Sequence, residues 1–164
     1  MLAYLAGTVA WQDSPPGTME ADSSIMSIRY LVGYDGSESA RRAFALALRM
    51  AGADDDGHVR AVTVLRTAQA GSETCALMMT DTSSRRAREL LDTLRSGSGD
   101  MADRVDVALA YGNPGDVLVA QVQAFAIDHI VIGHSAHGAL ARWLLGSVSG
   151  EVISRARVPV TIVP

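Results

Sequence analysis

The stretch that decides the fold is IRYLVGYDGSESARRAFALALRMA, residues 28–51. Residues 28–34 are largely apolar and include β-branched and aromatic side chains, which predicts a strand. Ser37 can then cap a helix, because a serine oxygen accepts a hydrogen bond from the free N–H groups of a first turn. The helix is indicated by apolar residues that recur every three or four positions: Ala40, Ala43, Phe44, Ala47, Leu48 and Ala51. A strand therefore runs directly into a helix across the turn YDGS.

The same alternation continues to the end of the sequence. Further strands are predicted at residues 58–65, 104–112, 128–133 and 158–163. Further helices are predicted at residues 81–96, after an irregular connection at 67–80, then from Pro114 with Asn113 as its cap, and from Ser147 with Glu151 in its first turn. The pattern predicts an α/β fold, a five-stranded parallel sheet with helices on both faces and right-handed crossovers. Ligands of such sheets bind beyond the carboxyl ends of the strands, where the winding reverses.

Length and composition favour one domain preceded by a tail. The chain has 164 residues, of which 48% are hydrophobic, enough for one core. Its first part contains DSPPGTMEADSS, in which Pro15, Pro16 and Gly17 disfavour regular structure. We therefore expect a flexible N-terminal tail at residues 1–25 and a single domain at residues 26–164.

The charged residues exclude several classes of function. All 14 basic residues are arginine, and without lysine the chain can form neither a Walker-type phosphate loop nor a Schiff base. The net charge of -4 and the scatter of the arginines disfavour nucleic acid as a partner. No apolar stretch approaches the roughly 20 residues that a membrane span needs, and no basic segment precedes the apolar start as in a signal peptide. With Cys75 as the single cysteine, we expect a reduced, cytoplasmic setting and no membrane partner.

The stretch GHSAHGALARWLLGSVS, residues 133–149, connects the predicted fourth strand to the last helix. A glycine-rich connection into a helix N-terminus presents free N–H groups and the positive end of the helix dipole, which together suit a phosphate. Glycine and serine also simply end strands and cap helices. Composition alone leaves both interpretations open.

The spacing in this stretch resembles the universal stress protein family, whose nucleotide-binding members carry G-x2-G-x9-G-[S/T] at this place. Here Gly133, Ala136, Gly146 and Ser147 occupy the frame, with alanine at the second glycine. The segments LVGYDGSESARRAFALAL, YGNPGDVLV and GSVSGEVISRARVPVTIV are also similar to the family, in the same order. The resemblance covers about residues 28–164 and implies an adenine-nucleotide alpha-hydrolase-like, Rossmann-like sandwich.

The resemblance implies a set of nucleotide-binding positions. Asp35 would accept hydrogen bonds near the adenosine moiety, although an aspartate after a strand also forms Asx turns. Val64 matches an apolar position that packs on adenine, although a core role is the commoner one for such a valine. Gly112 matches the glycine before the third helix, where a plain turn is equally consistent. The remaining positions are Gly33 after the first strand and the phosphate frame of Gly133, Ala136, Gly146, Ser147, Val148 and Ser149.

The function implied is a stress-response binding and signalling module that holds ATP, with Mg²⁺, and hydrolyses it weakly at most. Alanine at a position that needs positive φ costs roughly 1 to 2 kcal/mol, so Ala136 weighs against phosphate binding. The alternative is a nucleotide-free dimeric module of the same fold that binds other proteins. The resemblance also implies a homodimer in which the C-terminal strand pairs across a two-fold axis, a suitable use of an edge strand.

Two other interpretations are disfavoured by the residues. His129, His134 and His137 lack the further ligands of a structural metal site, so no metal is expected. An adenylation enzyme of the alpha-hydrolase type would carry an S-G-G-x-D-S-like loop after the first strand, and DGSES does not match it. No catalytic residue is assigned.

Overall fold

The fold was analysed in a computed structural model, which describes residues 27–66, 73–134 and 147–164 and leaves out the side chains of residues 73–83 and of Ser147. The elements follow in the order β1 (Arg29–Gly33), α1 (Glu38–Gly52), β2 (His58–Leu65), α2 (Glu73–Ser96), the 3₁₀ helix η1 (Gly99–Arg104), β3 (Val105–Tyr111), α3 (Pro114–Ala124), β4 (His129–Gly133), α4 (Ser147–Arg155) and β5 (Val160–Val163).

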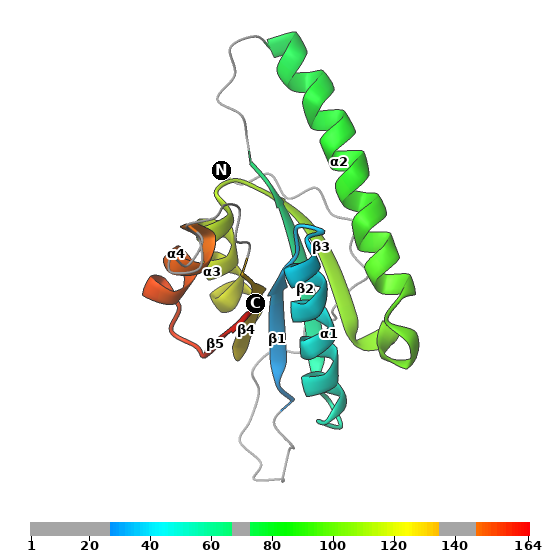
Figure 1. Cartoon of the computed structure of the whole chain (residues 1–164), viewed down its shortest axis with the longest axis vertical. Helices are drawn as coiled ribbons and strands as arrows, with labels where there is room; N and C mark the ends of the chain where they lie inside the picture. Colours follow the sequence, from blue (N-terminus) through cyan, green and yellow to red (C-terminus); the bar gives the residue numbers. More distant parts are fainter. Residues whose placement is uncertain (1–26, 67–72, 135–146) are drawn as a thin grey trace, which may run out of the picture.

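The strands form one parallel sheet in the order β3-β2-β1-β4-β5, which confirms the predicted fold class. Helices cover both faces: α1 and α2 lie on one side of the sheet, and α3 and α4 lie on the other (Figure 1). Successive residues of β1 alternate between these layers, so Tyr30 and Val32 pack toward α1 and α2 while Leu31 packs toward α3 and α4. The core is therefore two apolar layers separated by the sheet.

Helix α1 forms as its sequence predicts. The Ser37 side chain accepts a hydrogen bond from the backbone N–H of Ala40 at 3.1 Å and so caps the first turn. The buried face consists mainly of alanines with Phe44, and Leu48 is half-buried. Because alanine side chains are small, α1 can lie close to the sheet along its whole length.

Three details differ from the sequence prediction. Helix α2 begins at Glu73 instead of residue 81, because ETCALMMT contains good helix formers and no proline or glycine. The 3₁₀ helix η1 was not predicted; the Arg104 guanidinium anchors its end by donating to the carbonyls of Asp54 and Asp55 at 2.9 and 3.0 Å. Glu151 lies just beyond the first turn of α4, which spans residues 147–150.

A charged pair lies within the predicted apolar strand β2. Arg60 pairs with Asp106 directly across the β2–β3 register, and their side chains are 12% and 20% exposed. The Arg60 guanidinium also lies 3.5 Å from the centroid of the Phe125 ring, and its Nε donates to Gln121 Oε1 at 2.8 Å. The pair therefore links the amino-terminal half of the sheet to the end of α3.

Neighbouring strands partly bury a titratable group at the amino end of β4. His129 Nε2 lies 2.8 Å from Thr161 Oγ1, and its ring centroid lies 5.7 Å from that of Tyr30. Burial lowers the pKa of His129 below its ordinary value of about 6.5, because the charged imidazolium loses hydration there.

This burial predicts a pH dependence of stability. Below pH about 6.5 the unfolded chain binds a proton at His129 that the folded chain resists, so the free energy of unfolding should fall as the pH falls from 7.5 to 5. Urea unfolding at several pH values measures this slope, and His129→Gln should make it shallower. Equal slopes for the two proteins would contradict the assignment to His129.

Candidate functional site

The reversal of winding lies between β1 and β4. These strands are parallel neighbours, with Gly33 opposite Ile132, so the connections that follow them leave the sheet at the same place. After β1 the chain enters α1 on one face, and after β4 it enters α4 on the other. The carboxyl ends of β1 and β4 therefore mark the position where ligands of such sheets bind.

The end of β4 lies very close to the first turn of α1. A Cβ atom added at Gly133 would lie 2.5 Å from the carbonyl carbon of Ser39 and 2.6 Å from the backbone N of Ala40. Gly33, its neighbour on β1, faces the opposite layer, where an added Cβ would lie 3.0 Å from Leu118 Cδ1. Packing of helices against the sheet thus accounts for glycine at both predicted positions.

Asp35 lies in the turn between β1 and α1. Its side chain is exposed, and its Oδ1 accepts a hydrogen bond from the backbone N–H of Ser37 at 2.9 Å. This is the Asx turn that the sequence left open, and it fixes the carboxylate just beyond the carboxyl end of β1. The preceding residue, Tyr34, is buried with its ring edge-on to Phe44 at 6.3 Å. Burial raises the pKa of the Tyr34 phenol, and the charge of Arg41 partly offsets this shift.

The other face of the same edge is apolar. Val64 near the end of β2 and Val148 in the first turn of α4 are both half-buried and pack in the layer between the sheet and the helices α3 and α4. Gly112 follows β3 with φ of +138°, a conformation that side-chain-bearing residues rarely adopt. Its N–H donates to the Leu65 carbonyl at 3.0 Å, which makes it a turn residue between neighbouring strands.

Helix α4 begins at Ser147, as expected, and Ser149 is buried in its first turn. Its later turns are tied to α3, because Arg155 forms ion pairs with Asp116 at 2.5 Å and with Glu151 at 2.8 Å. Val152 of α4 is fully buried in the same apolar layer as Leu118 of α3, so packing also holds the helix against this face of the sheet.

Some predicted positions lie outside the described residues. Ala136 and Gly146 of the phosphate frame belong to residues 135–146, as does His137. Of the other two histidines, His129 begins β4 and His134 follows its last residue, so the strand separates them. Within the described parts of the chain, no group of three potential metal ligands was found.

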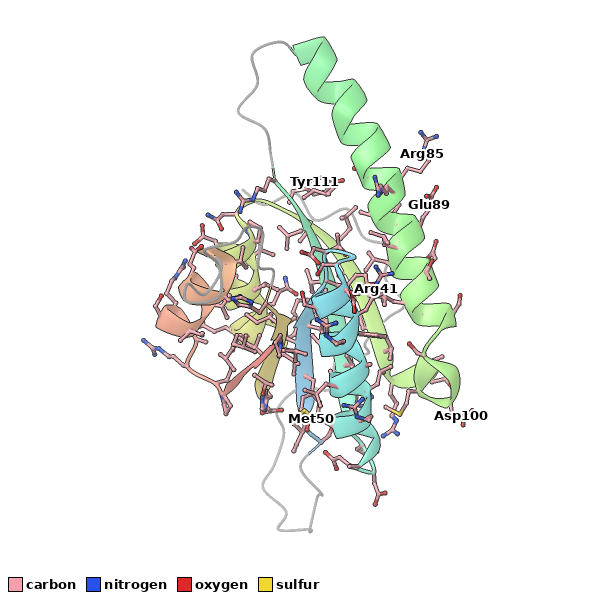
Figure 2. All side chains as sticks on the ribbon, in the orientation of Figure 1. Arg41, Met50, Arg85, Glu89, Asp100 and Tyr111 are labelled. Carbon is pink, nitrogen blue, oxygen red and sulfur yellow. The ribbon has the colours of Figure 1, made fainter. Side chains whose placement is uncertain are left out.

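Two side chains at this edge were not singled out from the sequence. Thr63, buried in β2, donates from Oγ1 to the Tyr34 carbonyl at 2.9 Å, and it is the one hydroxyl in HVRAVTVL. Tyr111 at the end of β3 is 41% exposed, and its hydroxyl lies 2.8 Å from Ser84 Oγ of α2. Figure 2 shows Tyr111 beside the middle of α2, while Arg85 projects from the opposite side of that helix.

The comparison with protein families identifies the group to which this architecture belongs. A model of the universal stress protein family matches residues 26–164. The chain belongs to this family. A search of curated proteins finds no match. The described part of the chain contains no helix long and apolar enough to cross a membrane.

Solved structures of this family share the fold. The universal stress protein UspA from Lactobacillus plantarum is 20% identical, with a TM-score of 0.74 over 84% of this chain and 97% of that one. A universal stress protein in complex with cAMP is 27% identical, with a TM-score of 0.58 over 84% and 96%. A family protein from Arabidopsis thaliana with AMP bound is 20% identical, with a TM-score of 0.61 over 83% and 90%.

The close packing at Gly133 leads to a stability prediction. Gly133→Ala should lower the free energy of unfolding by about 3 kcal/mol, because the added methyl group meets the backbone of α1. The matched control is Gly150→Ala in α4, where an added Cβ meets nothing within 4 Å and helix propensity should raise stability by about 0.5 to 1 kcal/mol. Urea unfolding of both variants measures the difference, and equal effects would contradict the packing argument.

Proposed function

We propose that this universal stress protein binds an adenine nucleotide at the carboxyl edge of β1, β2 and β4. The observation that carries the proposal is that β1, which leads into the Asp35 turn, and β4, which precedes α4, are parallel neighbours at the point where the winding reverses. Family structures that contain cAMP and AMP support the choice of ligand class.

The residues present at this edge fit such a ligand. Asp35 offers an exposed carboxylate, a suitable acceptor for the hydroxyl and amino groups of an adenosine. Val64 and Val148 offer apolar surface on the adjoining face, and Gly112 keeps the turn after β3 free of a side chain. The first-turn N–H groups of α4, at Ser147, Val148 and Ser149, are donors suited to a phosphate. Gly33 and Gly133 act indirectly, by letting α3 and α1 approach the edge.

ATP with Mg²⁺ is the nucleotide we propose, in a binding and signalling role. Mg²⁺ would neutralise phosphate charge, which matters in a chain without lysine. The described residues around Asp35 hold and orient a ligand, and we assign none of them as a general base. Binding with little or no hydrolysis is therefore the proposed activity.

A second candidate function is a nucleotide-free dimeric module that binds other proteins. It is favoured by one feature of the sequence, the alanine at position 136 where the family's nucleotide-binding frame has glycine. In a left-handed conformation this residue would cost roughly 1 to 2 kcal/mol, or about tenfold in affinity.

Isothermal titration of nucleotide-stripped protein with ATP and Mg²⁺ separates the two candidates. We expect binding by the wild type and about tenfold tighter binding by Ala136→Gly. Ala139→Gly, an identical change outside the glycine frame, should leave the affinity unchanged. If Ala136→Gly binds ATP and the wild type does not, the result favours the nucleotide-free function for the natural chain. If neither protein binds ATP, nucleotide binding is refuted.

We further propose that β5 mediates a homodimer. Among the described residues β5 pairs with β4 alone, and it ends the order of the sheet. Pro159 and Val163 turn their carbonyls toward β4, so alternation directs the N–H of Val160 to the open side. A second copy of β5 would satisfy the N–H and C=O groups of that side.

Size-exclusion chromatography with light scattering tests the dimer. Val160→Pro removes the outward N–H without removing a bond to β4, and it should shift the mass from two chains to one. Val160→Ala loses similar side-chain packing but keeps the N–H, so it should remain dimeric. A dimeric Val160→Pro protein would exclude pairing through this edge.

The remaining proposals concern organisation and location. We propose that residues 26–164 form the functional domain, with residues 1–25 as a tail, and that the protein acts in the cytoplasm. The single cysteine in the sequence supports a reducing location.

A further inference from the structure

Thr63 combines burial, a hydroxyl group and a position near the carboxyl end of β2. It is 5% exposed and lies between Val62 and Val64, which pack in the opposite layer. Its Oγ1 donates to the Tyr34 carbonyl at 2.9 Å. Because Tyr34 follows the last residue of β1, this side chain extends the link between β1 and β2 beyond the strand itself.

Tyr34 is held by β2 at both of its backbone polar groups. Its N–H donates to the Val62 carbonyl at 2.9 Å, and its carbonyl accepts from Thr63. The ring is 7% exposed and packs against Phe44 of α1. The peptide unit that leads into Asp35 therefore has a defined position and orientation.

Asp35 is held from its other side by α1. Its Oδ1 accepts from the Ser37 N–H at 2.9 Å, and Ser37 Oγ in turn accepts from Ala40 N–H at 3.1 Å. The exposed carboxylate thus lies between two anchors, one on β2 and one at the N-cap of α1. On β2, the backbone carbonyl of Val62 holds the Tyr34 N–H, and the Thr63 hydroxyl holds the Tyr34 carbonyl of the peptide unit that leads into Asp35.

We propose that Thr63 is a positioning residue, which orients the Asp35 carboxylate toward the adenosine part of the bound nucleotide through the Tyr34 carbonyl. The inference rests on the proposed function and adds a determinant of nucleoside recognition at the same site. Loss of the hydroxyl leaves a buried carbonyl without this donor, so the peptide before Asp35 should tilt to find another. Phosphate contacts made at α4 lie on the other face of the sheet and should be insensitive to this tilt.

The experiment compares ATP with tripolyphosphate, which lacks the nucleoside, as ligands in isothermal titration of the full chain. Thr63→Val keeps the shape of the side chain and removes the hydroxyl, and it should weaken ATP binding about fivefold while tripolyphosphate affinity is unchanged. Thr63→Ser keeps the hydroxyl and should restore most of the affinity for ATP. In an Asp35→Asn background, Thr63→Val should have little further effect, because the charge that it orients is already absent.

Two results with folded variants would overturn the inference while leaving the proposed function intact. Equal weakening of ATP and tripolyphosphate would show a general structural role for Thr63, and additive effects with Asp35→Asn would show independent action. If Thr63→Val does not fold, as circular dichroism would reveal, Thr63→Ala and Thr63→Ser carry the same comparison. A wild type that binds neither ATP nor tripolyphosphate would refute the proposed function itself, and the inference with it. If the wild type and Thr63→Val bind ATP with equal affinity, only the inference about Thr63 is refuted.

Discussion

The position of α1 on the sheet depends on the close packing of its first turn against the end of β4. At Gly133 there is no room for a Cβ atom, because Ser39 and Ala40 lie against the backbone of the strand. Helix α1 therefore packs on β4 as well as on the strands it connects. Together with the parallel pairing of β1 and β4, this contact places the start of α1 beside the end of β4.

The two faces of this edge are built differently. On the side of α1 and α2, polar groups are fixed by hydrogen bonds: Thr63 to Tyr34, and Asp35 to Ser37. On the side of α3 and α4, Val64 and Val148 supply apolar surface beside the start of a helix. In the proposed function, Asp35 on the first face would meet the hydroxyl and amino groups of the adenosine, whereas the valines and the first-turn N–H groups of α4 on the second face would meet the base and the phosphates. The edge thus offers complementary chemistry for each part of the proposed ligand.

The local elements were predictable wherever one periodicity was uninterrupted. Helix α1 has a serine cap and a regular apolar stripe, and the five strands are short apolar runs bounded by turn residues. The predicted start of α2 was wrong because the amphipathic pattern is weak in residues 73–80, where the helix propensity of the residues extends the helix. The Arg60–Asp106 pair was missed for another reason: the register of β2 and β3 brings together charges that are 46 positions apart in sequence.

The amino-acid sequence by itself determined the order of strands and helices, the glycines at the ends of β1 and β4, and the family to which the chain belongs. These features follow from local periodicity, turn chemistry and motif spacing, which a linear pattern contains. Only the tertiary structure decided why Gly133 is glycine, which face of the sheet Val64 occupies, and that Thr63 holds the turn carrying Asp35. Those facts depend on contacts across the sheet, since a hydrogen bond from β2 to the end of β1 is set by strand register and by no neighbour in sequence.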